Sequence, residues 1–68
     1  MGKAKVTFPS GATYVRRTRT HYTYALVGFH AGAYYVESMH TSERAARRAK
    51  GSKRLSILPV EFTEGGKA

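Results

Sequence analysis

The 68-residue sequence contains no cysteine and no aspartate, and its four acidic residues are all glutamates. Without cysteine, disulfides and cysteine-based zinc sites are excluded, so a small hydrophobic core has to stabilise the fold. Glu37, Glu43, Glu61 and Glu64 are dispersed along the chain and show no pairing typical of general acid–base catalysis. No serine lies in a nucleophile-elbow sequence. We therefore expect no catalytic residues and no enzymatic activity.

Motifs for metals and cofactors are missing as well. His21, His30 and His40 are spaced about ten residues apart, which is not a metal-ligand spacing. No glycine-rich phosphate-binding loop is present, and Gly28, Gly32 and Gly51 fall at predicted hairpin and helix-cap positions. We expect neither a metal site nor a cofactor.

Long hydrophobic runs are absent too. The longest apolar stretches are far shorter than the roughly 18 residues needed to span a bilayer. The first five residues, Met-Gly-Lys-Ala-Lys, lack the apolar run of a signal peptide. The sequence thus predicts a cytoplasmic protein without a membrane partner.

Positive charge is abundant. Twelve lysines and arginines stand against the four glutamates, which gives a formal net charge of +8. In so small a body this charge produces a positive field over much of the surface, which favours phosphate backbones or acidic protein surfaces. A hydrophobic share of 41% with five tyrosines and three phenylalanines argues against disorder.

The sequence pattern predicts one α+β domain in residues 12–64, preceded by a basic arm in 1–11 and followed by a flexible tail in 65–68. Residues 6–8 favour a short edge strand, followed by a turn. Further strands are expected in 12–18, 21–29, 33–39 and 55–62, with a hairpin between the second and third of these. The predicted order is (β)βββαβ, a small antiparallel sheet of three to four strands packed against one helix.

The predicted helix begins after Thr41, a good N-cap residue, and ends at Gly51, the usual residue after a helix. Its small residues share one side and are expected to pack on the sheet: Ser42, Ala45, Ala46 and Ala49. Its arginines share the opposite side, which is expected to face solvent or a partner. In the last strand the hydrophobic alternation changes phase near Pro59, which predicts a bulge or an edge position there.

Basic residues form two candidate clusters for binding an anionic partner. The first lies on the early strand and its turn: Arg16, Arg17 and Arg19. The second lies on the helix and the following loop: Arg44, Arg47, Arg48, Lys50, Lys53 and Arg54. Arginine offers a planar fork of donors that suits phosphates and guanine edges. Tyr22, Tyr24 and Tyr34 are candidates for aromatic contacts.

These clusters predict a nucleic-acid-binding protein, with duplex DNA favoured over RNA and a nucleoid-associated location. The alternative is an acidic patch on a host protein, and a third option is an RNA- or ribosome-associated accessory protein. The oligomeric state stays open.

The segment Val36-Glu-Ser-Met-His-Thr-Ser-Glu-Arg-Ala-Ala-Arg47 resembles the third-strand-to-helix segment of the ethylene-response-factor type DNA-binding domain, which also occurs in phage and mobile-element integrases. The resemblance implies a three-stranded sheet in the major groove, backed by a helix. It also implies that Arg16, Arg17 and Arg19 face the DNA, and that the alanine side of the helix supports the sheet.

The same order of strands and helix is similar to that of small phage proteins that inhibit host RNA polymerase. Those proteins combine a sheet with one helix and use arginines near the last strand to bind an acidic polymerase surface. The resemblance implies that Arg54 has this role here, although the last strand carries the acidic residues Glu61 and Glu64.

Overall fold

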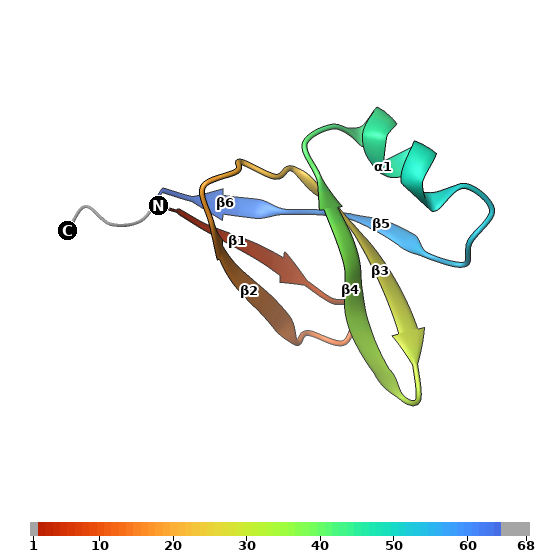
Figure 1. Ribbon diagram of the computed structural model, residues 1–68. Helices are drawn as coiled ribbons and strands as arrows, with labels where there is room; N and C mark the ends of the chain where they lie inside the picture. The colour runs from red at the N-terminus through yellow and green to blue at the C-terminus, as the bar shows by residue number, and fades with distance from the viewer. Residues whose placement is uncertain (1, 65–68) are drawn as a thin grey trace.

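The computed structural model describes residues 2–64 and shows strands and one helix in chain order (Figure 1). The elements are β1 (Gly2–Thr7), β2 (Thr13–Thr18), β3 (Tyr24–His30), β4 (Ala33–His40), α1 (Glu43–Lys50), β5 (Ser56–Pro59) and β6 (Glu61–Thr63). The α+β class is therefore confirmed. The predicted tail, 65–68, lies outside the described residues.

The strands form two antiparallel sheets of three strands each, where the sequence predicted a single sheet. Sheet A has the order β2-β1-β6, and sheet B has the order β4-β3-β5. The predicted order (β)βββαβ changes at its end, because the last predicted strand is divided between the two sheets.

β1 is the central strand of sheet A, whereas the sequence predicted an arm with a short edge strand. It pairs with β2 through six residues and with β6 through three. The physical reason is the alternation of its side chains: Ala4 and Val6 are fully buried, while Lys3 and Lys5 are exposed. A strand with period-two burial fits a sheet that has one covered face and one open face.

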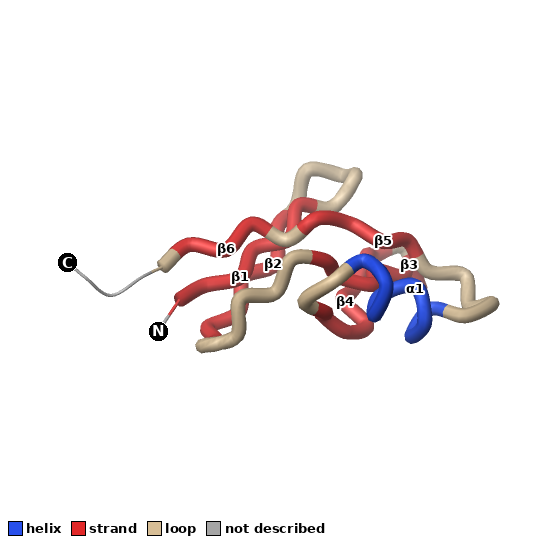
Figure 2. The backbone as a smooth tube through the Cα atoms, turned by 90° about the horizontal axis from the view of Figure 1, so that it is seen from above, coloured by secondary structure: helices blue, strands red, loops and turns tan. Residues whose placement is uncertain are grey.

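The two sheets share one extended segment, β5–β6, which is interrupted at Val60 (Figure 2). Pro59 has no N–H to donate and lies opposite Tyr24 at the end of the edge strand β5. The N–H of Val60 instead donates to the carbonyl of Thr23, at 2.9 Å. Ile57 and Leu58 are both half-buried, so the burial changes phase as predicted.

The main core lies between the sheets. Its buried members are Ala4, Val6 and Phe8 from β1 and the residue after it, and Ala25, Val27 and Met39 from sheet B. Half-buried side chains close its margins: Tyr22, Tyr34, Val36, Leu58, Val60 and Phe62. The inner face of sheet A therefore packs against one face of sheet B.

α1 covers the other face of sheet B. Leu26 alternates with Ala25 and Val27 along β3, and it is buried outside the inter-sheet core. The helix contacts β3 and β4, and its Ala46 is completely buried. In Figure 1, sheet A and α1 accordingly lie to either side of β3 and β4.

Two details of the helix differ from the prediction. The N-cap is Ser42, not Thr41: the backbone of Ser42 is extended, and its Oγ accepts a hydrogen bond from the Ala45 N–H at 3.1 Å. Ala49 is exposed, and Lys50 is half-buried in its place. The packed stripe runs from Ala46 to Lys50, since residues four apart lie on one side of a helix and a lysine stem can cover apolar surface.

Candidate nucleic-acid interface

The positive side chains of residues 2–64 lie at the surface, and none of them is buried. Within this part of the chain there is one ion pair, from Arg47 to Glu43 four residues earlier, with 2.7 Å between nitrogen and oxygen. An exposed pair of this kind contributes little to stability, about 0.3–0.5 kcal/mol. Most of the positive charge is therefore not neutralised within the described protein.

The densest group of these charges is the α1 patch, defined here as Arg44, Arg47, Arg48, Lys50, Lys53 and Arg54. Arg44 and Arg48 lie opposite the buried Ala46 on the helix, so their guanidinium groups face away from sheet B. Glu43 and the three helix arginines line an open depression of about 400 Å³. The sequence prediction that the arginine side of the helix is exposed is confirmed.

The loop that follows the helix extends this patch. Gly51 ends α1 with a φ of 53°, and its N–H donates to the Arg47 carbonyl at 3.1 Å. A further turn bond runs from the Lys53 N–H to the Lys50 carbonyl at 2.9 Å. Lys53 and Arg54 are exposed in this loop, and Lys50 is half-buried. The helix and this turn thus carry six positive groups on one continuous stretch of chain, residues 44–54.

The early arginines do not form one cluster. Arg16 and Arg17 are neighbours on β2, so they project to opposite faces of sheet A. Arg16 shares the face of Ala4 and lies over the Tyr22 ring, 5.9 Å from its centroid. Arg17 shares the outer face with Lys3, and Arg19 is exposed in the connection after β2.

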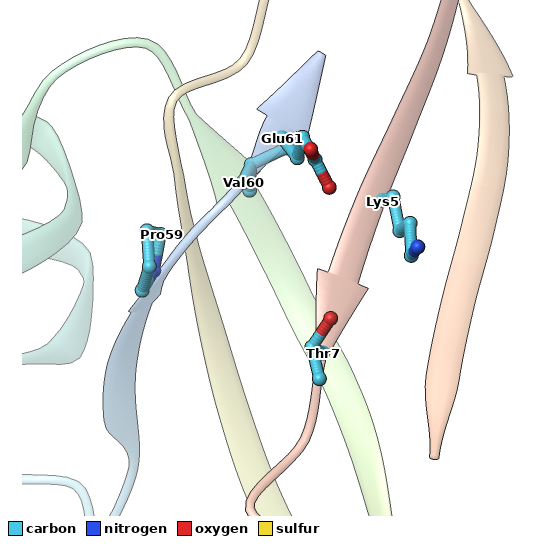
Figure 3. A pocket seen from close by; sticks show the side chains of 5 residues that line it. All are labelled: Lys5, Thr7, Pro59, Val60 and Glu61. Carbon is cyan, nitrogen blue, oxygen red and sulfur yellow. The ribbon is translucent and has the colours of Figure 1, made fainter. Parts of the chain in front are cut away.

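The outer face of sheet A carries a second group of charges, the sheet-A patch, defined as Lys3, Lys5 and Arg17. Lys3 lies directly opposite Arg17 in the β1–β2 register. Lys5 lies opposite Glu61 in the β1–β6 register, and both side chains project beside a pocket of about 380 Å³ (Figure 3). Sequence reasoning did not include the two lysines among its candidate site residues because it assigned them to an arm. Their alternation with Ala4 and Val6 was the available signal.

The tyrosines proposed for aromatic contacts are half-buried. Tyr22 and Tyr34 pack against the main core, and Tyr24 begins β3. Tyr34 stacks on Phe8 at 5.6 Å between ring centroids and meets Phe29 edge-on at 4.7 Å. The more exposed aromatic side chains are Tyr14, Tyr35 and Phe29, and Phe29 is 61% exposed. Sequence reasoning did not single out Phe29, which lies just before the β3–β4 turn.

Other polar groups offer little for chemistry. Ser38 Oγ and His40 Nε2 are 2.8 Å apart on β4, and both residues are half-buried. Among residues 2–64, no three side chains of the metal-ligating types gather at one place. Within the same residues, no helix has both the length and the apolar character that a bilayer crossing requires.

No protein-family model matches the chain, and comparisons with curated proteins and with solved structures find no match either. The segment 36–47, which carries the ethylene-response-factor resemblance, covers the second half of β4 and the first part of α1. The resemblance stays a prediction.

Proposed function

We propose that this chain is a non-enzymatic nucleic-acid-binding protein that contacts duplex DNA through the α1 patch. The observation that carries the proposal is the set of exposed guanidinium groups on the side of α1 opposite its buried Ala46. A cytoplasmic, nucleoid-associated location belongs to the same proposal.

The chemistry of the patch favours phosphates. Arg44 and Arg48 have no acidic partner within ion-pair distance among residues 2–64, and Arg47 shares its charge with Glu43. A guanidinium group binds two phosphate oxygens at once in a planar geometry, which ammonium groups do not match. The major groove of B-DNA, about 12 Å wide, admits an α-helix, so the same side chains would reach base edges as well.

The way in which α1 is fixed to the rest of the fold supports the same function. Ser42 caps its first turn, and Ala46 anchors it against sheet B. The arginines therefore project from a fixed backbone, which limits the conformational entropy lost on binding to that of their side chains.

A salt titration tests the proposal. We expect the affinity for a 20-base-pair duplex, followed by fluorescence anisotropy, to fall log-linearly with salt. If about six phosphates are neutralised, the loss between 50 and 200 mM salt is on the order of 10³-fold. Parallel titrations with duplex RNA of the same sequence measure the preference for DNA. A salt-independent or undetectable affinity for both duplexes would contradict the proposal.

Charge reversal locates the interface. The variant Arg44→Glu/Arg48→Glu should lower affinity at least tenfold and reduce the salt slope by about 1.8, since each lost phosphate contact contributes about 0.9. The matched control Arg16→Glu/Arg19→Glu changes the net charge equally but lies outside both patches. Its affinity for the duplex should fall much less. Equal losses in the two folded variants would show that net charge, rather than the α1 patch, determines binding.

An acidic protein surface would use the same guanidinium groups. A pull-down from nuclease-treated lysate separates this alternative from the proposal. If one protein is captured in stoichiometric amount and no duplex binding is measurable, the partner of the α1 patch is a protein and the proposal of DNA binding is wrong.

A further inference from the structure

The sheet-A patch lies on a different face of the molecule from the α1 patch. The inner face of sheet A packs on sheet B, so Lys3, Lys5 and Arg17 point away from sheet B on the outer side. α1 covers the opposite face of sheet B. Figures 1 and 2 agree that β1 starts toward one end of the molecule while α1 lies toward the other.

The sheet-A patch contains an unfavourable pair. Lys3 and Arg17 are in direct cross-strand register, and like charges in this position destabilise a sheet. No acidic side chain lies on β1 or β2, and neither residue has an ion-pair partner among residues 2–64. An anion that contacts both groups would remove their repulsion.

The rest of the outer face is suited to an extended polyanion. Thr7 and Thr13 offer hydroxyl donors on the same side as the charges. Along β2, Val15 lies between Thr13 and Arg17 and is 51% exposed. Among the strand residues that the structure describes, Glu61 is the one acidic residue on this face, and it lies opposite Lys5 at the margin formed by β6. The charges of β1 and β2 therefore form one group on the open side of sheet A.

We propose that the sheet-A patch is a second nucleic-acid contact, and that one molecule of this protein bridges two duplex segments. This inference depends on the proposed function, because it assigns a duplex to each patch. The phosphates of one segment would contact α1, and those of the other would contact Lys3, Lys5 and Arg17.

Bridging follows from the stiffness of DNA. The Cα atoms span 40 × 26 × 13 Å, so a duplex in contact with one patch would have to bend around the protein to reach the other. The persistence length of DNA is about 150 base pairs, and sharp bending over one or two helical turns is unfavourable. Two separate segments meet the two faces without this deformation.

A bead assay tests the inference. One duplex is attached to beads, a labelled duplex of the same sequence is free in solution, and the protein is added at 100 mM salt. Fluorescence anisotropy measures the binding of a single duplex in parallel. The natural protein should bind one duplex and also recover the labelled duplex on the beads.

The variants Lys3→Glu and Arg16→Glu form a matched pair. Both lower the net charge equally, and Arg16 and Arg17 are adjacent on β2 but on opposite faces. Lys3→Glu should retain single-duplex affinity within about threefold while recovery falls at least tenfold, because one duplex still binds at α1. Arg16→Glu should retain recovery. Lys3→Glu also places opposite charges across the strands, so its urea midpoint should not fall, and unfolding would not explain the loss.

The outcomes separate the two proposals. Single-duplex binding without any recovery by the natural protein overturns bridging and leaves the proposed function intact. Bridging through the sheet-A patch is also overturned if Lys3→Glu leaves the recovery of labelled duplex unchanged. An equal loss of recovery with Arg16→Glu has the same consequence. No binding of even one duplex contradicts the proposed function itself.

Discussion

The central strands of the two sheets, β1 and β3, differ in the way their side chains are buried. β1 alternates strictly, with exposed Lys3 and Lys5 between buried Ala4 and Val6. β3 is buried without interruption from Ala25 to Gly28, because sheet A covers one of its faces and α1 the other. The comparison shows that sheet B is covered on both faces at the centre of β3, whereas sheet A has one open face.

The largest expected effect comes from the covered strand. Leu26→Ala removes a side chain that is 1% exposed, and we expect a loss of about 3 kcal/mol in the free energy of unfolding. For a domain of this size that is a large share of total stability. Urea unfolding followed by circular dichroism measures the loss. The matched substitution on the open face, Lys5→Ala, should change stability by no more than about 0.5 kcal/mol. Similar values for the two variants would contradict the distinction between the sheets.

A smaller effect is expected where α1 joins sheet B. Ser42→Ala removes the acceptor of the Ala45 N–H and should lower stability by about 1 kcal/mol. Ser42→Asp retains an acceptor and should restore most of the loss. Thermal unfolding of the two variants measures the difference. If Thr41→Ala is the more damaging substitution, the helix is capped one residue earlier than described.

The smallest effect is expected on the open face, and it has the opposite sign. Lys3→Glu converts the repulsive pair with Arg17 into an attractive one and should raise stability by about 0.5 kcal/mol. A double-mutant cycle with Arg17→Ala measures this coupling, which should weaken as salt is added. A coupling of zero at low salt would show that the two charges do not interact across the strands.

Sequence reasoning recovers the elements whose signals are local. The hairpin at residues 30–33 was predicted from the glycine in its turn. Ala31 and Gly32 have φ values of 52° and 80°, as a two-residue type I′ turn requires. Gly51 marks the helix end, and Pro59 marks the interruption of the last strand. Each of these depends on the conformational preference of one residue.

Features set by distant partners were not predicted. β1 gains its central place by pairing with residues 61–63, and no short-range pattern specifies that pairing. In β4, Glu37 is left without a cross-strand partner, because Leu26 pairs with Ser38 and Val27 with Val36. This bulge places Met39 on the same face as Val36, against the simple period-two expectation.

The candidate site shows the same division. The arginine side of α1 follows from helix periodicity, and its exposure was predicted. Arg16 and Arg17 were grouped because they are adjacent in sequence, although a period of two separates them by face. The sheet-A patch required knowledge that residues 2–7 form a strand paired with β2, which depends on tertiary structure.

Because β5 continues into β6, both sheets are completed only late in the synthesis of this domain. β1 leaves the ribosome well before β6, yet residues 3–5 find their second neighbour only when residues 61–63 have been made. Until then the edge of β1 on that side exposes its backbone N–H and C=O groups, and β3 likewise lacks β5. Contacts between such distant segments form slowly, so we expect the nascent chain to remain open to proteases and chaperones at least until residues 61–63 have been made.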